Sequence, residues 1–238
     1  MNAYQQKVRQ RFNNERVIWP EDNSWSSHSA ASIEKLVHEA LNIPSLNNNV
    51  ILNAGSGGSS YNLKEENIIH YDIVAKRLPP LNSVLGTVER MPFESNFFSH
   101  TICVGSVLNY CDPLLAIREL ARVTNKEGII LMDYDSSCSW EFVGTKDYCK
   151  SSTFVETFYN NEVDEIFTYS HKYIEAICKS IGLQLLKRTP YHIISPLAYR
   201  ITRNEKISGT LGYLDIFLNK IPIFTNKAAT ITLLCQKA

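Results

Sequence analysis

Residues 50–63, VILNAGSGGSSYNL, decide the predicted fold, because a short apolar run breaks there into glycine and serine. A buried strand that ends in such a loop is typical of parallel sheets, whose ligands bind beyond the carboxyl ends of the strands. Two questions follow from this stretch: whether the rest of the chain forms such a sheet, and which ligand the loop holds.

Strand-like and helix-like segments alternate along the rest of the chain. An amphipathic helix is predicted over 30–41, a second follows a cap at Asp112 and ends in a turn at Gly128, and a third runs from a cap at Ser170 to Gly182. This alternation predicts an α/β fold whose mostly parallel sheet is covered on both faces. The strand-like runs are 50–54, 68–72, 83–87, 100–105, 129–134, 183–189 and 230–235.

Composition excludes several classes of protein. The 24 Lys and Arg balance the 24 Asp and Glu, so nucleic acid is not an expected partner. The N-terminus is polar and no apolar run is long enough to span a membrane, so we expect no membrane partner and a cytoplasmic protein. The six cysteines form no CxxC pair and predict reduced thiols, and the histidines show no metal-ligand spacing.

Two classes of cofactor compete for the glycine loop. A dinucleotide requires a third glycine where Ser60 stands, a full helix, and an acid about 20 residues on. Here Asp72 follows Gly57 by only fifteen residues, and the intervening NLKEEN leaves room for scarcely one helical turn. A nicotinamide-dependent reductase is therefore the less favoured alternative.

S-adenosylmethionine suits the loop better because it carries no phosphates. Its amino-acid end needs backbone donors and a close approach, which Gly55 and Gly57 permit. Its ribose diol can donate to an acid at the end of the second strand, where Asp72 stands. Its adenine can lie between apolar side chains at the end of the third strand.

Residues 50–135 resemble the class I S-adenosylmethionine-dependent methyltransferases, particularly the quinone-biosynthesis branch. The resemblance rests on NAGSGGS, HYDI, GTVERMPF, NFFSHTICVGSVLNYCDP and IRELARVTNKEGIILMDYD, which follow the order and spacing of the family's motifs. It implies a Rossmann-like methyltransferase fold with a seven-stranded, mostly parallel sheet that ends in an antiparallel strand. It also implies methyl transfer to a small or medium-sized organic acceptor by in-line displacement.

The resemblance assigns the cofactor to eleven residues at four strand ends. Asn53, Thr87 and Ser99 depart from the family's acids, so a cofactor-binding protein without transferase activity is a second alternative. The expected cofactor-binding residues are Asn53, Gly55, Ser56, Gly57, Asp72, Ile73, Thr87, Val88, Glu89, Gly105 and Ser106.

A single domain over residues 1–238 is expected, in three parts. Residues 1–48 form an N-terminal helical lid with Tyr4, Phe12, Trp19 and Trp25, residues 49–135 form the cofactor half, and residues 136–238 form the substrate half with an insertion at 193–226. The aromatic residues of 154–173 form either a substrate roof or the core of a helical cap. Candidate bases are His28, Asp135 and His192. The acceptor, the nucleophilic atom and the oligomeric state stay open.

Overall fold

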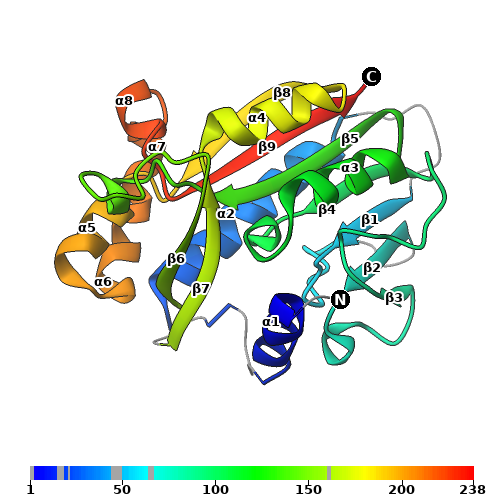
Figure 1. Cartoon of the computed structure of the whole chain (residues 1–238), viewed down its shortest axis with the longest axis horizontal. Helices are drawn as coiled ribbons and strands as arrows, with labels where there is room; N and C mark the ends of the chain where they lie inside the picture. Colours follow the sequence, from blue (N-terminus) through cyan, green and yellow to red (C-terminus); the bar gives the residue numbers. More distant parts are fainter. Residues whose placement is uncertain (1–2, 15–18, 21, 44–49, 64–66, 160–161) are drawn as a thin grey trace.

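The computed structural model describes residues 3–14, 19–20, 22–43, 50–63, 67–159 and 162–238. Within them a seven-stranded sheet has the strand order β3-β2-β1-β4-β5-β9-β8 (Figure 1). The strands are β1 (Ile51–Ala54), β2 (Ile68–Asp72), β3 (Ser83–Leu85), β4 (Phe98–Cys103), β5 (Thr124–Asp135), β8 (Leu183–Tyr191) and β9 (Thr230–Lys237).

The sheet is parallel from β3 to β5, and β9 runs antiparallel between β5 and β8. This confirms the predicted seven-stranded, mostly parallel sheet with an antiparallel strand. The predicted turn at Gly128 is wrong, because this glycine lies inside β5. Glu127 takes the left-handed conformation there, with φ of 60°. Helix and strand therefore follow one another at Thr124 without a glycine stop.

Helices cover both faces of the sheet (Figure 1). The helix α2 (Ser24–Leu41) packs Ile33, Val37 and Ala40 against β4 and β5 on one face. The helices α3 (Pro113–Val123) and α4 (His171–Ser180) belong to the larger core cluster on the opposite face. Since side chains alternate along a strand, the same strands supply both clusters. Between β1 and β2 the described residues form no α-helix, in keeping with the short NLKEEN segment.

Asp112 caps α3 as the sequence predicts, because its carboxylate accepts from the backbone N–H groups of Leu114 and Leu115 at 2.9 and 3.2 Å. We expect Asp112→Ala to lower the free energy of unfolding by about 1 kcal/mol. For a chain of this length that loss corresponds to a fall of about 2–4 °C in melting temperature. Thermal denaturation measures it. Asp112→Asn is the control, because its amide oxygen still accepts; an alanine variant as stable as wild type would contradict the cap.

A β-hairpin lies at 152–169, where a helical cap is one of the two alternatives expected for the aromatic residues of 154–173. Its strands are β6 (Ser152–Tyr159) and β7 (Glu162–Tyr169), paired antiparallel outside the main sheet. The helical cap is therefore wrong over the hairpin. Successive side chains of a strand point to opposite faces, so only every second residue of β6 or β7 faces the same side. Phe154 and Phe167 pack against Tyr4 of the N-terminal helix α1 (Ala3–Asn14).

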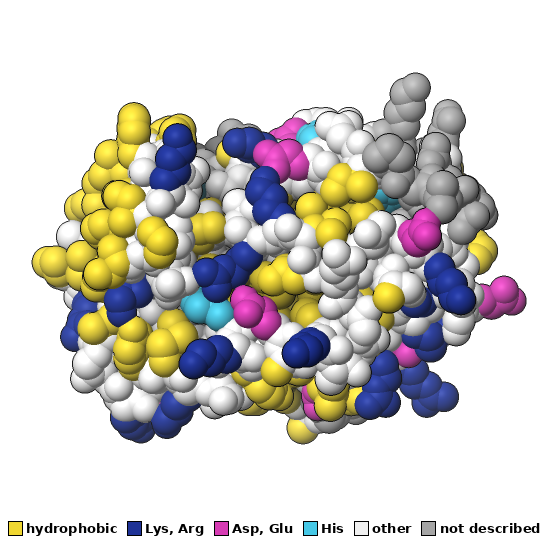
Figure 2. Space-filling model, turned by 90° about the horizontal axis from the view of Figure 1, so that it is seen from above, with side chains coloured by type: hydrophobic (Ala, Val, Ile, Leu, Met, Phe, Trp, Pro, Cys, Tyr) yellow, Lys and Arg dark blue, Asp and Glu magenta, His cyan; other side chains and the backbone are white. Residues whose placement is uncertain are grey.

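The insertion folds into four short α-helices and one 3₁₀ helix: α5 (Ser195–Thr202), α6 (Glu205–Thr210), η5 (Leu211–Leu214), α7 (Asp215–Leu218) and α8 (Pro222–Thr225). Helix α6 packs against α2. Figure 2 shows hydrophobic side chains gathered over this end of the molecule, on its left. The insertion thus has an apolar outer surface, whose exposed residues are Ile201, Ile207, Tyr213, Leu214, Ile216, Phe217, Ile221 and Ile223.

Cys138 and Cys149 form a disulfide, with their Cα atoms 4.3 Å apart. The predicted reduced state is wrong for these two residues, because the loop between them turns back and pairs the Cys149 N–H with the Ser137 carbonyl. The other four cysteines are free and buried. None of the helices in the described ranges combines the length and apolar character that crossing a bilayer requires.

Candidate active site

Two adjoining cavities lie at the carboxyl edge of the sheet. The first cavity encloses about 900 Å³ of open space and the second about 1060 Å³, their mouths included. Phe12, Trp19, Gly105 and Tyr110 line both, so these residues form the boundary between the cavities. The other residues of the first cavity come from α1 and from the loops that follow β1 to β4.

The glycine loop after β1 forms one wall of the first cavity. Gly55 has φ of 72°, and a Cβ there would lie 2.3 Å from the Val107 side chain, so only glycine fits. Its N–H donates to the Tyr71 carbonyl at 2.7 Å. Asn53 holds the loop from below, because its side-chain amide donates to the Ser59 carbonyl at 2.7 Å. The loop is therefore fixed before any ligand enters.

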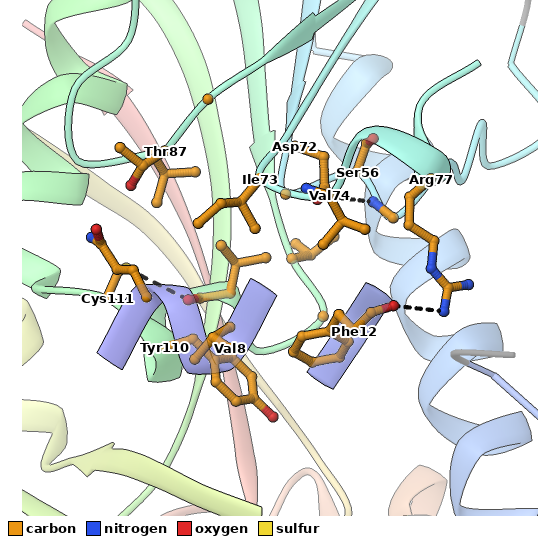
Figure 3. Close-up of a pocket in the computed structure, with 18 of the residues that line it drawn as sticks. Val8, Phe12, Ser56, Asp72, Ile73, Val74, Arg77, Thr87, Tyr110 and Cys111 are labelled. Atoms are coloured by element: carbon orange, nitrogen blue, oxygen red, sulfur yellow. Dashed lines mark hydrogen bonds between the residues drawn. The ribbon is translucent and has the colours of Figure 1, made fainter. Parts of the chain in front are cut away.

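Asp72 ends β2 beside this loop (Figure 3). Its two carboxylate oxygens accept from the backbone N–H groups of Gly57 and Val74, each at 2.8 Å. Burial raises the pKa of this carboxyl, and the hydrogen bond from Gly57 opposes the rise. Each carboxylate oxygen has two lone pairs, so both oxygens can still accept from a ligand.

The loop after β3 is held by a fully buried tyrosine. The Tyr71 hydroxyl reaches the Thr87 carbonyl at 2.9 Å and the Arg90 carbonyl at 3.2 Å. Thr87 and Val88 consequently line the first cavity. Glu89 points elsewhere, because it accepts from the Gln5 side chain and from the Asp112 N–H.

The loop after β4 is anchored by Asp133, which accepts from the N–H groups of Gly105 and Ser106 at 3.0 and 2.8 Å. The Tyr191 hydroxyl donates to the same carboxylate at 3.0 Å. Burial raises the pKa of Asp133 to about 6, against the effect of these hydrogen bonds. Ser106 takes the left-handed conformation, with φ of 62°. Asp133 thus positions the segment between the two cavities.

Helix α1 closes the first cavity, and Figure 3 shows Val8 and Phe12 facing Ile73 and Val74 across it. The helix is attached at both ends. Tyr4 donates to the Glu165 carbonyl at 2.8 Å, and the Arg77 guanidinium donates to the Phe12 carbonyl at 3.2 Å. These attachments hold α1 over the first cavity, and the predicted N-terminal lid stays a prediction.

The second cavity lies between the sheet edge, the β6–β7 hairpin and the insertion. Tyr199 and Glu205 reach it from the insertion, and Val155 and Ile166 from the hairpin. Seven of its residues are aromatic and four are acidic: Phe12, Trp19, Trp25, Tyr110, Phe142, Tyr191 and Tyr199, with Asp135, Glu141, Asp164 and Glu205.

Asp135 ends β5 and lines the second cavity. One carboxylate oxygen accepts from the Ser106 and Thr230 hydroxyls at 3.2 and 2.9 Å. Burial raises the pKa of Asp135 to about 7, and the nearby charge of Asp133 adds to the rise. A carboxyl with such a pKa exchanges protons readily at neutral pH.

The two candidate histidines lie behind this cavity and do not line it. His192 stacks on Trp25 with ring centroids 4.0 Å apart, and its Nε2 lies 2.8 Å from the Ser29 hydroxyl. Burial holds the pKa of His192 well below its usual value, so the ring is neutral. His28 pairs with Asp215 at 3.1 Å. His192 therefore supports the cavity wall that Trp25 and Ser29 form, and the His28 ring packs against His192 with centroids 4.9 Å apart.

Of the eleven predicted cofactor-binding residues, eight line the first cavity; Ser106 lines the second, and Asn53 and Glu89 lie outside both. Sequence reasoning missed further lining residues, which come from α1 and from positions beside the predicted residues, several of them inside the motifs quoted above. No local pattern marks them as ligand-facing. They are Gln5, Val8, Tyr61, Val74, Arg77, Gly86, Val104, Val107 and Cys111.

Comparison with known proteins adds a family match over about a third of the chain and a fold. Residues 53–132 match the family model described as "Methyltransferase domain". No curated protein matches the chain. Among solved structures, geranyl diphosphate C-methyltransferase from Streptomyces coelicolor A3(2), in complex with Mg²⁺, geranyl diphosphate and S-adenosyl-L-homocysteine, is similar with a TM-score of 0.63 and 9% identity, covering 100% of this chain and 99% of that one.

Two further structures differ in what their names say they do. A Thermotoga maritima protein described as an S-adenosylmethionine-dependent methyltransferase, "possible histamine N-methyltransferase", has a TM-score of 0.57 and 13% identity over 99% of this chain and 98% of that one. The [4+2]-cyclase SpnF has a TM-score of 0.52 and 14% identity over 87% of this chain and 80% of that one. At such identities these likenesses establish the Rossmann-like fold and leave the substrate open.

Proposed function

We propose that this class I S-adenosylmethionine-dependent methyltransferase transfers the methyl group of its cofactor to a small or medium-sized organic acceptor. The observation that carries the proposal is the pair of adjoining cavities. One is walled by the glycine loop and Asp72, and the other opens beyond Gly105 and Tyr110. A donor and an acceptor can therefore be bound on opposite sides of one boundary.

The first cavity fits S-adenosylmethionine. Asp72 accepts from the ribose hydroxyls, and the loop of Gly55 and Gly57 admits the amino-acid end. Thr87 and Val88 flank the adenine, with Ile73 on its other side. Asn53 and Glu89 act indirectly, because the first holds the glycine loop and the second holds α1 and the start of α3.

Methyl transfer requires aligned reactants and the exclusion of water more than activation of the methyl group, because the sulfonium methyl is already electrophilic. The reacting atoms must meet in line at about 3–3.5 Å. Phe12 and Trp19 line the boundary between the cavities, where the reacting atoms would meet, and exclude water from it. The acceptor's proton leaves to Asp135, which is the candidate base that lines the second cavity. His192 supports Trp25 and Ser29, and His28 packs against His192.

Calorimetric titration tests the cofactor assignment. We expect S-adenosylhomocysteine to bind in a one-to-one complex and NADPH to give no heat, because the loop lacks the third glycine and the helix that a pyrophosphate needs. Binding of NADPH without S-adenosylhomocysteine would favour the reductase alternative. Binding of S-adenosylhomocysteine without methyl transfer to any acceptor would favour a cofactor-binding protein, the alternative that Asn53, Thr87 and Ser99 suggest. A cytoplasmic location stays a prediction from the sequence.

A further inference from the structure

The second cavity carries more negative than positive charge. No lysine or arginine is among its described lining residues, while four carboxylates are. Asp164 forms an ion pair with Arg11. Asp135, Glu141 and Glu205 form no ion pair among the described residues, although the charge of the exposed Arg203 acts on Glu141. A positively charged ligand would therefore interact favourably with the carboxylates of this cavity.

Aromatic rings line the same cavity beside the carboxylates. Trp25 and Tyr199 pack edge to face with centroids 6.0 Å apart, and Phe142 lies near Glu141 in sequence and in the cavity wall. The faces of aromatic rings attract organic cations, and the attraction strengthens where water is excluded. Carboxylates with aromatic rings thus form a surface complementary to an organic ammonium group.

A buried hydroxyl without a partner among the described residues indicates that this cavity suits a polar ligand. Thr168 is 2% exposed, its Oγ1 makes no hydrogen bond with any described residue, and the residue lines the second cavity. Asp164 and Ile166 precede it at alternate positions of β7 and line the cavity too, so this face of the strand points inward. An unpaired buried hydroxyl costs free energy that a polar ligand would recover.

From these three observations we infer that the acceptor is an organic amine bound as its ammonium form, held by the carboxylates and aromatic rings of the second cavity. The inference rests on the proposed function and names the substrate class of that site. Asp72 is the acid that lines the first cavity, whereas the four carboxylates line the second and so face the acceptor.

Anionic acceptors fit the cavity poorly. A carboxylate or diphosphate would lie among like charges, which costs binding free energy. No group of three or more His, Cys, Asp or Glu in the described part of the chain is arranged to hold a metal ion. The four carboxylates of the second cavity are therefore not arranged as a metal site.

The reaction balances with the groups named. The ammonium N–H proton passes to the Asp135 carboxylate, which frees the nitrogen lone pair. That lone pair forms the N–C bond as the C–S bond breaks, and the electron pair of the broken bond stays on sulfur. The products are the methylated ammonium ion, which carries the positive charge that left the sulfur, and S-adenosylhomocysteine with a neutral sulfur; Asp135 later returns its proton to water.

Matched ligands test the inference. In protein saturated with S-adenosylhomocysteine, calorimetry compares 2-phenylethylamine and tryptamine with 2-phenylethanol, 3-phenylpropanoate and indole-3-propanoate. We expect at least one amine to bind about tenfold more tightly than its matched alcohol or carboxylate. With S-adenosylmethionine, the same amine should gain one methyl group by mass spectrometry. Equal or tighter binding of the alcohol or carboxylates, or binding by no amine, would overturn the inference.

Variants tie the preference to the cavity. Glu205→Gln and Glu141→Gln should each weaken amine binding about five- to tenfold and leave binding of 2-phenylethanol unchanged. Glu156→Gln is the matched control, because Glu156 is exposed on β6 between the lining residues Val155 and Thr157. An equal loss in the control would contradict the assignment. Failure of S-adenosylhomocysteine to bind would instead refute the proposed function, so the two failures are distinguishable.

Discussion

Asp135→Asn should lower kcat/KM by about 10²–10⁴-fold, because the amide cannot take up the acceptor's proton. In the wild-type enzyme the carboxyl must be ionised to act as a base, and burial raises its pKa to about 7. The rate should therefore rise tenfold per pH unit below about 7 and level off above it. Initial rates of S-adenosylhomocysteine release between pH 5.5 and 8.5 measure this profile. The rise that belongs to Asp135 should be absent from the variant.

Cofactor affinity separates a catalytic from a structural role for Asp135. The residue lines the second cavity and not the first, so the variant should bind S-adenosylhomocysteine as well as wild type does. Glu156→Gln, which changes an exposed carboxylate, should retain the wild-type rate and profile. A variant with the wild-type rate, or one that keeps the rise below pH 7, would show that Asp135 is not the base.

Asp72→Ala should weaken S-adenosylhomocysteine binding by about tenfold to a few hundredfold. Charge-assisted hydrogen bonds from the two ribose hydroxyls contribute about 1.5–3 kcal/mol each, and about 1.4 kcal/mol corresponds to a factor of ten. The alanine also leaves the N–H groups of Gly57 and Val74 without their acceptor. Calorimetric titration gives the change in affinity.

A stability measurement without ligand shows how far Asp72→Ala disturbs the glycine loop itself, apart from the loss of the ribose contact. Unpaired Gly57 and Val74 N–H groups should lower the free energy of unfolding by about 1–3 kcal/mol. Asp72→Asn should lose less affinity than the alanine variant, because its amide oxygen still accepts. If Asp72→Ala binds S-adenosylhomocysteine with wild-type affinity, Asp72 is not the ribose ligand.

The sequence predicted the elements whose signals are local. Strand β2 has the predicted bounds of 68–72, Asp112 caps α3, and Gly182 follows α4 with φ of 85°. Alternating apolar runs, caps and glycine stops each act within a few residues, so they can be read without the fold. The same is true of the glycine loop and Asp72, which lie in two neighbouring motifs, NAGSGGS and HYDI.

The second cavity could not be predicted because its parts are far apart in the sequence. Trp25, Asp135, Thr168 and Glu205 come from α2, β5, the hairpin and the insertion. The hairpin itself was missed because its strands pair with each other outside the main sheet. Asp135 was predicted only because it ends a strand, whereas nothing local distinguishes Thr168 from any other strand threonine.

A crystal structure of the protein with S-adenosylhomocysteine tests the central claim most directly. The account predicts the ribose hydroxyls on Asp72, the adenine beside Thr87 and Val88, and the sulfur at the boundary formed by Gly105 and Tyr110, facing the second cavity. A ligand bound elsewhere, or one whose sulfur points away from the cavity that Asp135 lines, would contradict it.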